Sequence, residues 1–294
     1  MHSGLALRCD CRWLDRVVQA LLWLLAALVC GVFCWLLFDI VIEGGAGLSW
    51  SFLSQLPEDA GRAGGIVSIL VATLAVLVVC LSVALPIGLG TAIWLAEYSD
   101  HLTVARWVRS SLQLLAGVPS IVIGLFGYAF FCRALGFGYS LLAGGLTLAC
   151  MVLPLLVGAL EAGLRAVPES LRQGAAALGL SQAGTLLHLL LPAAAPALIA
   201  GLILSVGRAL AETAALLFTS GYVTRMPESL ADSGRVLSVH IFDLTMNVAG
   251  GDHYAYTTAL VLLGLLCAIN ALAKLAVGVL FNGNARRNEQ VFSQ

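Results

Sequence analysis

Two charged residues, Arg208 and Glu212, interrupt the otherwise apolar run 193–218. A charge at the centre of a membrane span costs about 2.5–3.5 kcal/mol, so two charges there are expected to have a role. Placed four residues apart on one helix, they share a face and can form an ion pair. Arg208 offers planar donors suited to an oxyanion, and Glu212 would position the guanidinium and weaken its hold on the anion. We predict that both residues, with the adjacent Thr213, line a substrate pathway; the alternative is a pair that only neutralises itself and fixes packing.

A second candidate site is the segment 165–192, which lies between two apolar runs. Pro168 suits the first turn of a helix, and Gly179 suits its C-terminal stop. Ser181 can cap a second helix that runs to Leu191 and ends at Pro192. The pattern predicts a helical hairpin outside the membrane, and these physical signals alone fit a plain connector as well as a docking element.

Six apolar stretches are long enough to cross about 30 Å of hydrocarbon, which takes roughly 20 residues. They are 17–38, 63–96, 111–131, 139–160, 193–218 and 254–281. The first has a basic flank, but its 22 residues are too many for a signal-peptide core, and we interpret it as a retained helix. The second would form about 51 Å of helix, so we expect it to tilt, kink near Pro86 or extend beyond the bilayer. We therefore predict an all-α integral membrane protein with six transmembrane helices.

The overall composition agrees with a membrane protein. Of 294 residues, 60% are hydrophobic and 11% are charged, and the mean hydropathy is +0.98, whereas soluble domains are roughly a quarter charged. The net charge of −1 gives no indication of nucleic-acid binding. Ten basic residues fall on one side of the six spans and four on the other. The positive-inside rule therefore predicts that both termini and segment 165–191 are cytoplasmic, and that segment 219–253, with a short interfacial helix within 226–247, is external.

Clusters typical of enzymes and metal sites are missing from the sequence. The histidines are dispersed, and the close cysteine pairs Cys9–Cys11 and Cys30–Cys34 lack a second pair of ligands, so no metal site is predicted. The single lysine, Lys274, stands between Ala273 and Leu275 and cannot belong to a phosphate-binding P-loop. We therefore expect this chain to bind no cofactor and to depend on a separate subunit for energy from ATP.

Two other classes of membrane protein compete with this interpretation. A proton-coupled secondary transporter would usually contain inverted repeats and several intramembrane carboxylates. Here only Glu212 lies deep in a predicted span, and no convincing repeat is visible. A membrane-embedded enzyme would need facing nucleophiles, histidines or acidic pairs, but the histidines outside the N-terminus lie in separate loops: His101, His188, His240 and His253.

The hairpin resembles the coupling loop of ABC importer permeases, whose motif is written E-A-A-x3-G-x9-I-x-L-P. Gln173, Gly174 and Ala175 stand at the E-A-A positions, followed at the motif's spacing by Gly179, Leu189, Leu191 and Pro192. Gln replaces the Glu, and Gly replaces one Ala. The resemblance implies that this hairpin docks into a groove of an ATPase subunit and that Gln173, Gly174, Ala175, Gly179, Leu191 and Pro192 serve the coupling.

A second resemblance covers nearly the whole chain after about Gly64. The segments 116–127 (AGVPSIVIGLFG) and 207–219 (GRALAETAALLFT) are similar to signatures of phosphate permeases of the PstA type. Leu95-Ala96-Glu97-Tyr98 and Val239-His240-Ile241 also match recurring segments of that family. This chain differs from the second signature at Gly207, Ala211 and Ala215. A permease for another oxyanion, such as phosphonate or phosphite, is the alternative substrate reading.

The resemblance implies the MetI-like fold of ABC importer permeases and import of inorganic phosphate from periplasm to cytoplasm. Its implied partners are a pair of ATP-binding subunits, a second homologous permease subunit, a periplasmic phosphate-binding protein and membrane lipid. The chain would be a multi-pass protein of the bacterial inner membrane. Its predicted organisation is an N-terminal part at 1–62 with the first span, a permease core at 63–281, and a cytoplasmic tail at 282–294.

Overall fold

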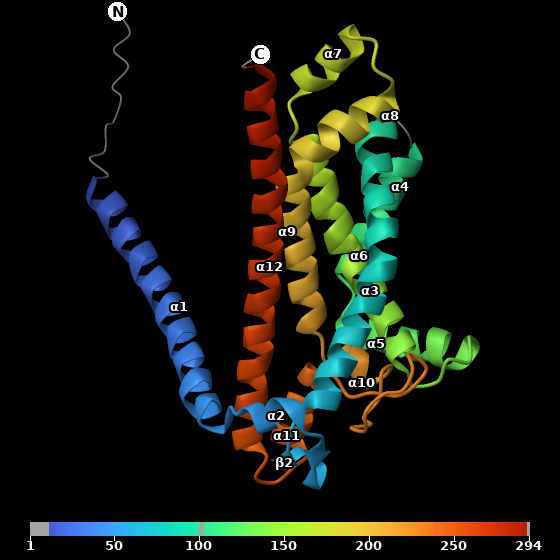
Figure 1. Ribbon diagram of the computed structural model, residues 1–294. Helices are drawn as coiled ribbons and strands as arrows, with labels where there is room; N and C mark the ends of the chain where they lie inside the picture. The colour runs from blue at the N-terminus through green and yellow to red at the C-terminus, as the bar shows by residue number, and fades with distance from the viewer. Residues whose placement is uncertain (1–11, 100–102, 293–294) are drawn as a thin grey trace, which may run out of the picture.

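The computed structural model describes residues 12–99 and 103–292. Residues 1–11 and 293–294 of the predicted terminal segments lie outside this part, as do Cys9, Cys11 and His101. Helices make up the described architecture, apart from one short two-stranded ribbon (Figure 1). The prediction of an all-α architecture is therefore confirmed.

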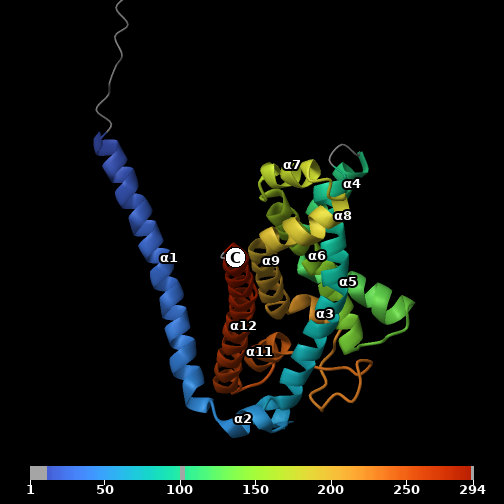
Figure 2. The same ribbon diagram turned by 45° about the horizontal axis from the view of Figure 1, so that its top comes forward.

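The first helix, α1 (Arg12–Gly47), contains the predicted span 17–38 and diverges from the other helices toward its N-terminal end (Figures 1 and 2). Its apolar window is not buried against the rest of the chain, as expected of a helix whose surroundings are lipid. Near its C-terminal end it meets α12 (Asp252–Phe292), where the Tyr256 hydroxyl donates a 3.1 Å hydrogen bond to Asp39.

A compact connection follows α1 and leads into the second span. It consists of α2 (Trp50–Ser54), strand β1 (Pro57–Glu58), the 3-10 turn η1 (Asp59–Gly61) and strand β2 (Ala63–Gly64). The strands pair antiparallel, with Pro57 opposite Gly64. Residues 63 and 64, predicted as the start of a span, therefore belong to this ribbon.

The second span is one long helix that changes its geometry before it ends. The α-helix α3 (Val67–Ile93) contains Pro86 and continues directly into the π-helix η2 (Trp94–Tyr98). Together they make 32 residues, or about 48 Å of helix. The expectation that this stretch exceeds a straight crossing is confirmed.

The core is formed where α3 packs against α6 (Leu141–Arg165). Every fourth residue of α3 on the buried face is small or of moderate size, in the series Ser68, Ala72, Val76, Cys80, Ala84, Gly88, Ala92. Such a stripe lets two helices approach closely. At Gly145 of α6 the contact is so tight that an added Cβ would lie 2.5 Å from the Cβ of Val79. The two helices thus pack closely and form the centre of the helical core.

The third apolar stretch, predicted as the span 111–131, is broken. Helix α4 (Thr103–Ala116) is followed by α5 (Ser120–Gly127) and the π-helix η3 (Tyr128–Ala134), and the two arms are bent by 103°. The break contains Pro119, which cannot donate a backbone hydrogen bond and disfavours a helical conformation in the residue before it. The stretch predicted as the third span is therefore present as a bent pair of helices, and the bend itself was not predicted.

The hairpin consists of α7 (Glu169–Ala177) and α8 (Gln182–Thr185). Its second arm was predicted to end at Pro192, and this is wrong. Helix α8 continues through the π-helix η4 (Leu186–Leu190) into α9 (Leu191–Leu210). The Leu191 amide donates to the Leu186 carbonyl, five residues back. Pro192 then occupies the first turn of α9, where its missing N–H is tolerated.

The chain after α9 crosses the end of the molecule opposite the hairpin. It contains α10 (Ala214–Leu217) and α11 (Leu237–Met246), so the predicted short helix within 226–247 is present. Helix α12 then returns beside α9 toward the hairpin end and continues through Phe292, which makes most of the predicted tail 282–294 helical.

The described residues include five helices that are long and apolar enough to cross a membrane, or six spans if the bent pair counts as one. Helix α1 begins, and α12 ends, toward the end of the molecule that carries α7, whereas α2 and α11 lie at the opposite end (Figure 1). We call these two ends the hairpin end and the α11 end.

Candidate functional site: a groove between two arginines

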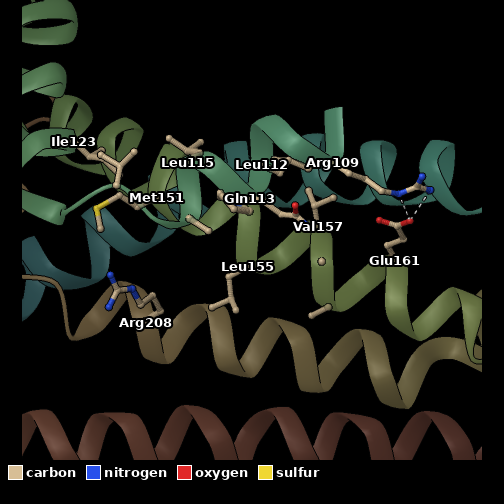
Figure 3. A pocket seen from close by; sticks show the side chains of 15 residues that line it. Arg109, Leu112, Gln113, Leu115, Ile123, Met151, Leu155, Val157, Glu161 and Arg208 are labelled. Carbon is tan, nitrogen blue, oxygen red and sulfur yellow. Dashed lines mark hydrogen bonds and ion pairs between the residues drawn. The ribbon is translucent and has the colours of Figure 1, made fainter. Parts of the chain in front are cut away.

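A groove of about 760 Å³ runs along α4, α5, α6 and α9. Most of its lining is apolar, and its charged side chains are Arg109, Glu161 and Arg208. Figure 3 shows Arg208 near Met151 at one end, and Arg109 with Glu161 at the other. Both arms of the bent pair, α4 and α5, contribute side chains to its wall.

The predicted ion pair between Arg208 and Glu212 is present, with 2.7 Å between the guanidinium nitrogen and the carboxylate oxygen. The prediction that both residues lie on one helix is wrong, because α9 ends at Leu210 and Glu212 follows its C-terminal end. The Glu212 carbonyl accepts a 2.6 Å hydrogen bond from the Ser238 hydroxyl of α11. The contact with α11 therefore holds the chain in place where the helix stops.

The two partners of this pair differ sharply in exposure. The Arg208 side chain is 51% exposed and lines the groove, whereas the Glu212 side chain is 6% exposed. The arrangement presents a guanidinium to the groove and keeps its carboxylate partner behind it. A positive group held in this way suits an anion that enters the groove.

The third predicted pathway residue, Thr213, lies elsewhere. It precedes α10, makes no side-chain capping bond there, and is not among the residues that line the groove. Of the predicted set, the structure brings Arg208 to the groove, places Glu212 behind it, and leaves Thr213 in the connection to α10.

The hairpin end of the groove carries an ion-pair cluster centred on Glu161. Arg109 of α4 contacts Glu161 of α6 at 2.8 Å, and Arg165 approaches the same carboxylate oxygen at 3.0 Å. Both guanidinium groups also donate to the Leu95 carbonyl of η2, at 2.9 and 2.8 Å. This cluster ties α4, α6 and the end of the second span together.

This cluster was not predicted from the sequence. Arg109 and Arg165 are two of the ten basic residues on the predicted cytoplasmic side, and Glu161 directly follows the apolar stretch 139–160. The partners lie 52 residues apart in the chain. The one local sign of this cluster in the sequence was a carboxylate, Glu161, at the end of a predicted span.

The hairpin has the local structure that its sequence predicts. The Ser181 hydroxyl accepts from the Gly184 amide at 3.2 Å and caps α8. Gly179 has a φ of +73°, the left-handed conformation that ends α7. Among the predicted coupling residues, Ala175 is buried, Leu191 is half-buried, and Gln173, Gly174, Gly179 and Pro192 are exposed. Leu178, at the tip, is 81% exposed.

Arg172 fixes the hairpin to the transmembrane helices. Its guanidinium donates to the Glu97 carboxylate of η2 at 2.8 Å and to the Leu164 carbonyl at 3.0 Å. The Gln182 amide of α8 adds a 2.9 Å bond to the Glu97 carbonyl. A small apolar cluster lies beneath these contacts, consisting of Ala96, Leu164, Val167, Leu186, Leu190 and Ala194. Both arms of the hairpin therefore contact η2.

Another ion pair, of which little is exposed, lies at the α11 end. Arg235 contacts Asp243 at 2.7 Å, and the His240 ring lies 3.4 Å from the same guanidinium. Burial, aided by the charge of Arg235 and opposed by Asp243, lowers the pKa of His240 to about 4. These residues stabilise the connection before α12. Among the described residues, no three His, Cys, Asp or Glu side chains are grouped so that they could hold a metal ion.

The chain matches the family described as binding-protein-dependent transport system inner membrane component, over residues 84–281. The chain belongs to this family. It is 34% identical over 210 residues to the probable ABC transporter permease protein YqgI of Bacillus subtilis, with 71% of each chain covered. It is also 34% identical over 245 residues to the phosphate transport system permease protein PstA of Mycobacterium leprae, covering 80% of this chain and 79% of that one.

Two solved ABC importers share the fold of this permease. A chain of the MetNI methionine transporter in an inward-facing conformation matches with a TM-score of 0.55 and 19% identity, covering 74% of this chain and 95% of that one. A bacterial alginate importer matches with a TM-score of 0.61 and 13% identity, covering 90% and 98%. The predicted ABC importer permease fold is confirmed. This permease is thus a multi-pass, non-catalytic inner-membrane subunit that works with ATPase subunits and a binding protein.

Proposed function

We propose that this permease moves inorganic phosphate from periplasm to cytoplasm and that Arg208 contacts the anion in the groove. The observation that carries the proposal is a half-exposed guanidinium facing a largely apolar groove, held at 2.7 Å by the buried Glu212. Glu212 alone would repel a phosphate, so its contribution comes through Arg208. The relatives named as phosphate permeases support this choice of substrate.

The hairpin provides the contact with the ATPase in this proposal. Its polar contacts through Arg172 and Gln182 point back to η2, which leaves the tip around Leu178 and Gly179 for docking. The partners are two ATP-binding subunits, a second homologous permease and a periplasmic phosphate-binding protein. The chain itself binds no cofactor, and ATP is used by the partner subunits. Both termini and the hairpin lie in the cytoplasm, in accordance with the basic bias of that side.

Single and double neutral substitutions test the role of Arg208. Arg208→Gln, Glu212→Gln and the double variant are compared for uptake of labelled phosphate and for co-purification with the partner subunits. We expect the double variant to assemble and to remain inactive, because the positively charged guanidinium that would bind the anion is gone. Recovery of uptake in the double variant would show that the pair only neutralises itself and would remove Arg208 from the mechanism.

A matched control and a competition assay complete this test. Arg225→Gln removes an exposed arginine whose contact with Asp232 is 3.8 Å long, and it should leave uptake unchanged. Unlabelled phosphate should compete in the parent, whereas sulfate, phosphonate and phosphite should compete weakly. If one of these anions competed more strongly than phosphate, that anion would be the better candidate for the substrate.

A further inference from the structure

We propose that the groove contains a second oxyanion-binding station at its hairpin end, in which Arg109 binds the anion and Glu161 competes with it. This inference rests on the proposed function for the identity and direction of the substrate. It assigns to Arg109 a role in receiving the anion after Arg208, before release from the hairpin end.

The two arginines share one groove and lie at its opposite ends (Figure 3). The α6 segment that separates these ends, from Met151 to Glu161, rises about 15 Å. The wall between them is mostly apolar and includes Leu112, Leu115, Leu155 and Val157. An anion that leaves Arg208 therefore crosses a region that offers little to replace its water of hydration. A guanidinium at the far end supplies the next set of donors.

The geometry at Glu161 allows Arg109 to change partners. The carboxylate oxygen Oε1 of Glu161 accepts from Nε of Arg109 at 2.9 Å and from Nε of Arg165 at 3.0 Å. The Glu161 side chain is only 14% exposed, and an unpaired charge in such a position is strongly destabilising. Because Arg165 also holds this carboxylate, Arg109 can turn to an oxyanion without leaving Glu161 unpaired.

Arg109 is the arginine of this end that faces the groove. Its side chain is 31% exposed and lines the groove, whereas Arg165 lines a different depression beside the hairpin. Arg106 is three residues earlier on α4 and also lies outside the groove. The position of Arg109 thus distinguishes it from its basic neighbours and provides a matched control on the same helix.

A thiol placed in the groove three residues before Glu161 on α6 can report anion binding without transport. Gly158 lines the groove, and a Cβ added there would meet no atom within 4 Å. Gly158→Cys is introduced into a chain whose eight cysteines are replaced, and the assembled, nucleotide-free transporter is treated with a negatively charged thiol reagent. The modification rate is measured against inorganic phosphate, with potassium chloride at equal ionic strength and a neutral reagent as controls.

Phosphate should slow the anionic reagent in the parent and in Arg106→Gln. The phosphate concentration that gives half-protection should rise about tenfold in Arg109→Gln, as expected for the loss of a charge-assisted hydrogen bond. Glu161→Gln should lower that concentration, since the competing carboxylate is removed. A purely structural ion pair predicts the opposite for Glu161→Gln, because α4 and α6 would loosen.

Other outcomes would overturn the proposal. One is that phosphate does not protect the thiol in the parent, and another is that it protects Arg109→Gln as well as the parent. A third is that phosphate protects Glu161→Gln no better than the parent. Arg109→Lys, which keeps the charge, should retain part of the protection and serves if Arg109→Gln does not assemble. Arg208→Gln separates this inference from the proposed function: protection at the hairpin end should persist there, whatever happens to uptake.

Discussion

The guanidinium of Arg172 in α7 lies 2.8 Å from the carboxylate of Glu97 in η2, although the two residues are 75 positions apart in the chain. Both side chains are largely buried, with 20% and 9% exposure. The Leu95 carbonyl of the same π-helix accepts hydrogen bonds from Arg109 and Arg165. One short segment, η2, therefore contacts the hairpin on one side and the end of the groove on the other.

We expect Glu97→Gln to uncouple phosphate uptake from ATP hydrolysis. The substitution removes the charge from a partly buried contact of a kind that typically contributes about 1.5–3 kcal/mol. It therefore weakens the attachment of the hairpin to η2, while the bond from Gln182 to the backbone carbonyl of residue 97 remains. Uptake by the assembled transporter should fall while ATPase activity remains. Glu169→Gln is the matched control, because Glu169 pairs with the same Arg172 at 3.5 Å and is 68% exposed. Equal uptake in Glu97→Gln and Glu169→Gln would contradict the prediction.

Gly179 tests whether the turn of the hairpin must keep its conformation. A φ of +73° is disfavoured for a β-branched side chain, although open space surrounds the position. Gly179→Val should insert into the membrane and lose coupled uptake. Gly179→Asn should retain most of it, because Asn tolerates the left-handed region. Membrane insertion and uptake are measured together, and normal uptake by Gly179→Val would argue against a role of this turn in coupling.

Stability should fall on mild acidification because of His240. Its pKa in the folded chain is about 4, against 6.5 for an ordinary histidine. Between these values the unfolded chain binds a proton that the folded chain excludes, so stability is complete above pH 6.5 and is lost as the pH falls toward 4. At pH 5 the loss is about 2 kcal/mol.

Thermal unfolding at pH 7 and pH 5 measures this effect. His240→Gln should show a smaller difference between the two pH values than the parent. His188→Gln, which replaces an exposed histidine in η4, should leave the difference intact. An unchanged difference in His240→Gln would assign the pH dependence to other groups.

The orientation of the chain can be tested by accessibility of single cysteines. In a cysteine-free background, Gln173→Cys should react with an impermeant thiol reagent only after the cells are opened. Glu228→Cys, in the exposed connection before α11, should react in intact cells. Labelling of Gln173→Cys from outside would reverse the proposed topology.

The sequence predicts the long apolar helices and the hairpin because their signals are local. Hydropathy over about 20 residues identifies a span, and Pro168, Gly179 and Ser181 each act on the backbone beside them. The bend at Pro119 also had a local signal, but the apolar composition on both sides concealed it. The end of α9 had no local signal, since Ala211 and Glu212 both favour a helix. The contact of Glu212 with Ser238 comes from a segment distant in the sequence.

The site was only partly predictable for the same reason. Arg208 and Glu212 are four residues apart and could be paired from the sequence alone. Arg109 and Glu161 become partners because α4 and α6 pack together, and Arg172 reaches Glu97 because the hairpin folds back onto η2. Such contacts depend on the tertiary arrangement, which no spacing rule describes.

The uninterrupted path of the helix from Gln182 through η4 to Leu210 has a mechanical consequence. The second arm of the hairpin, α8, and Arg208 lie on this one helix, and its part from Leu190 to Arg208 forms a lever about 27 Å long. If this lever turns as a rigid rod about Leu190, a tilt of about 5° displaces Arg208 by about 2 Å, close to the distance between the hydrogen and the acceptor in a hydrogen bond. Pro196, which lies inside α9, is the point at which this lever can bend and reduce the stroke. A small movement of an attached ATPase would thus be enough to change which atoms Arg208 can reach.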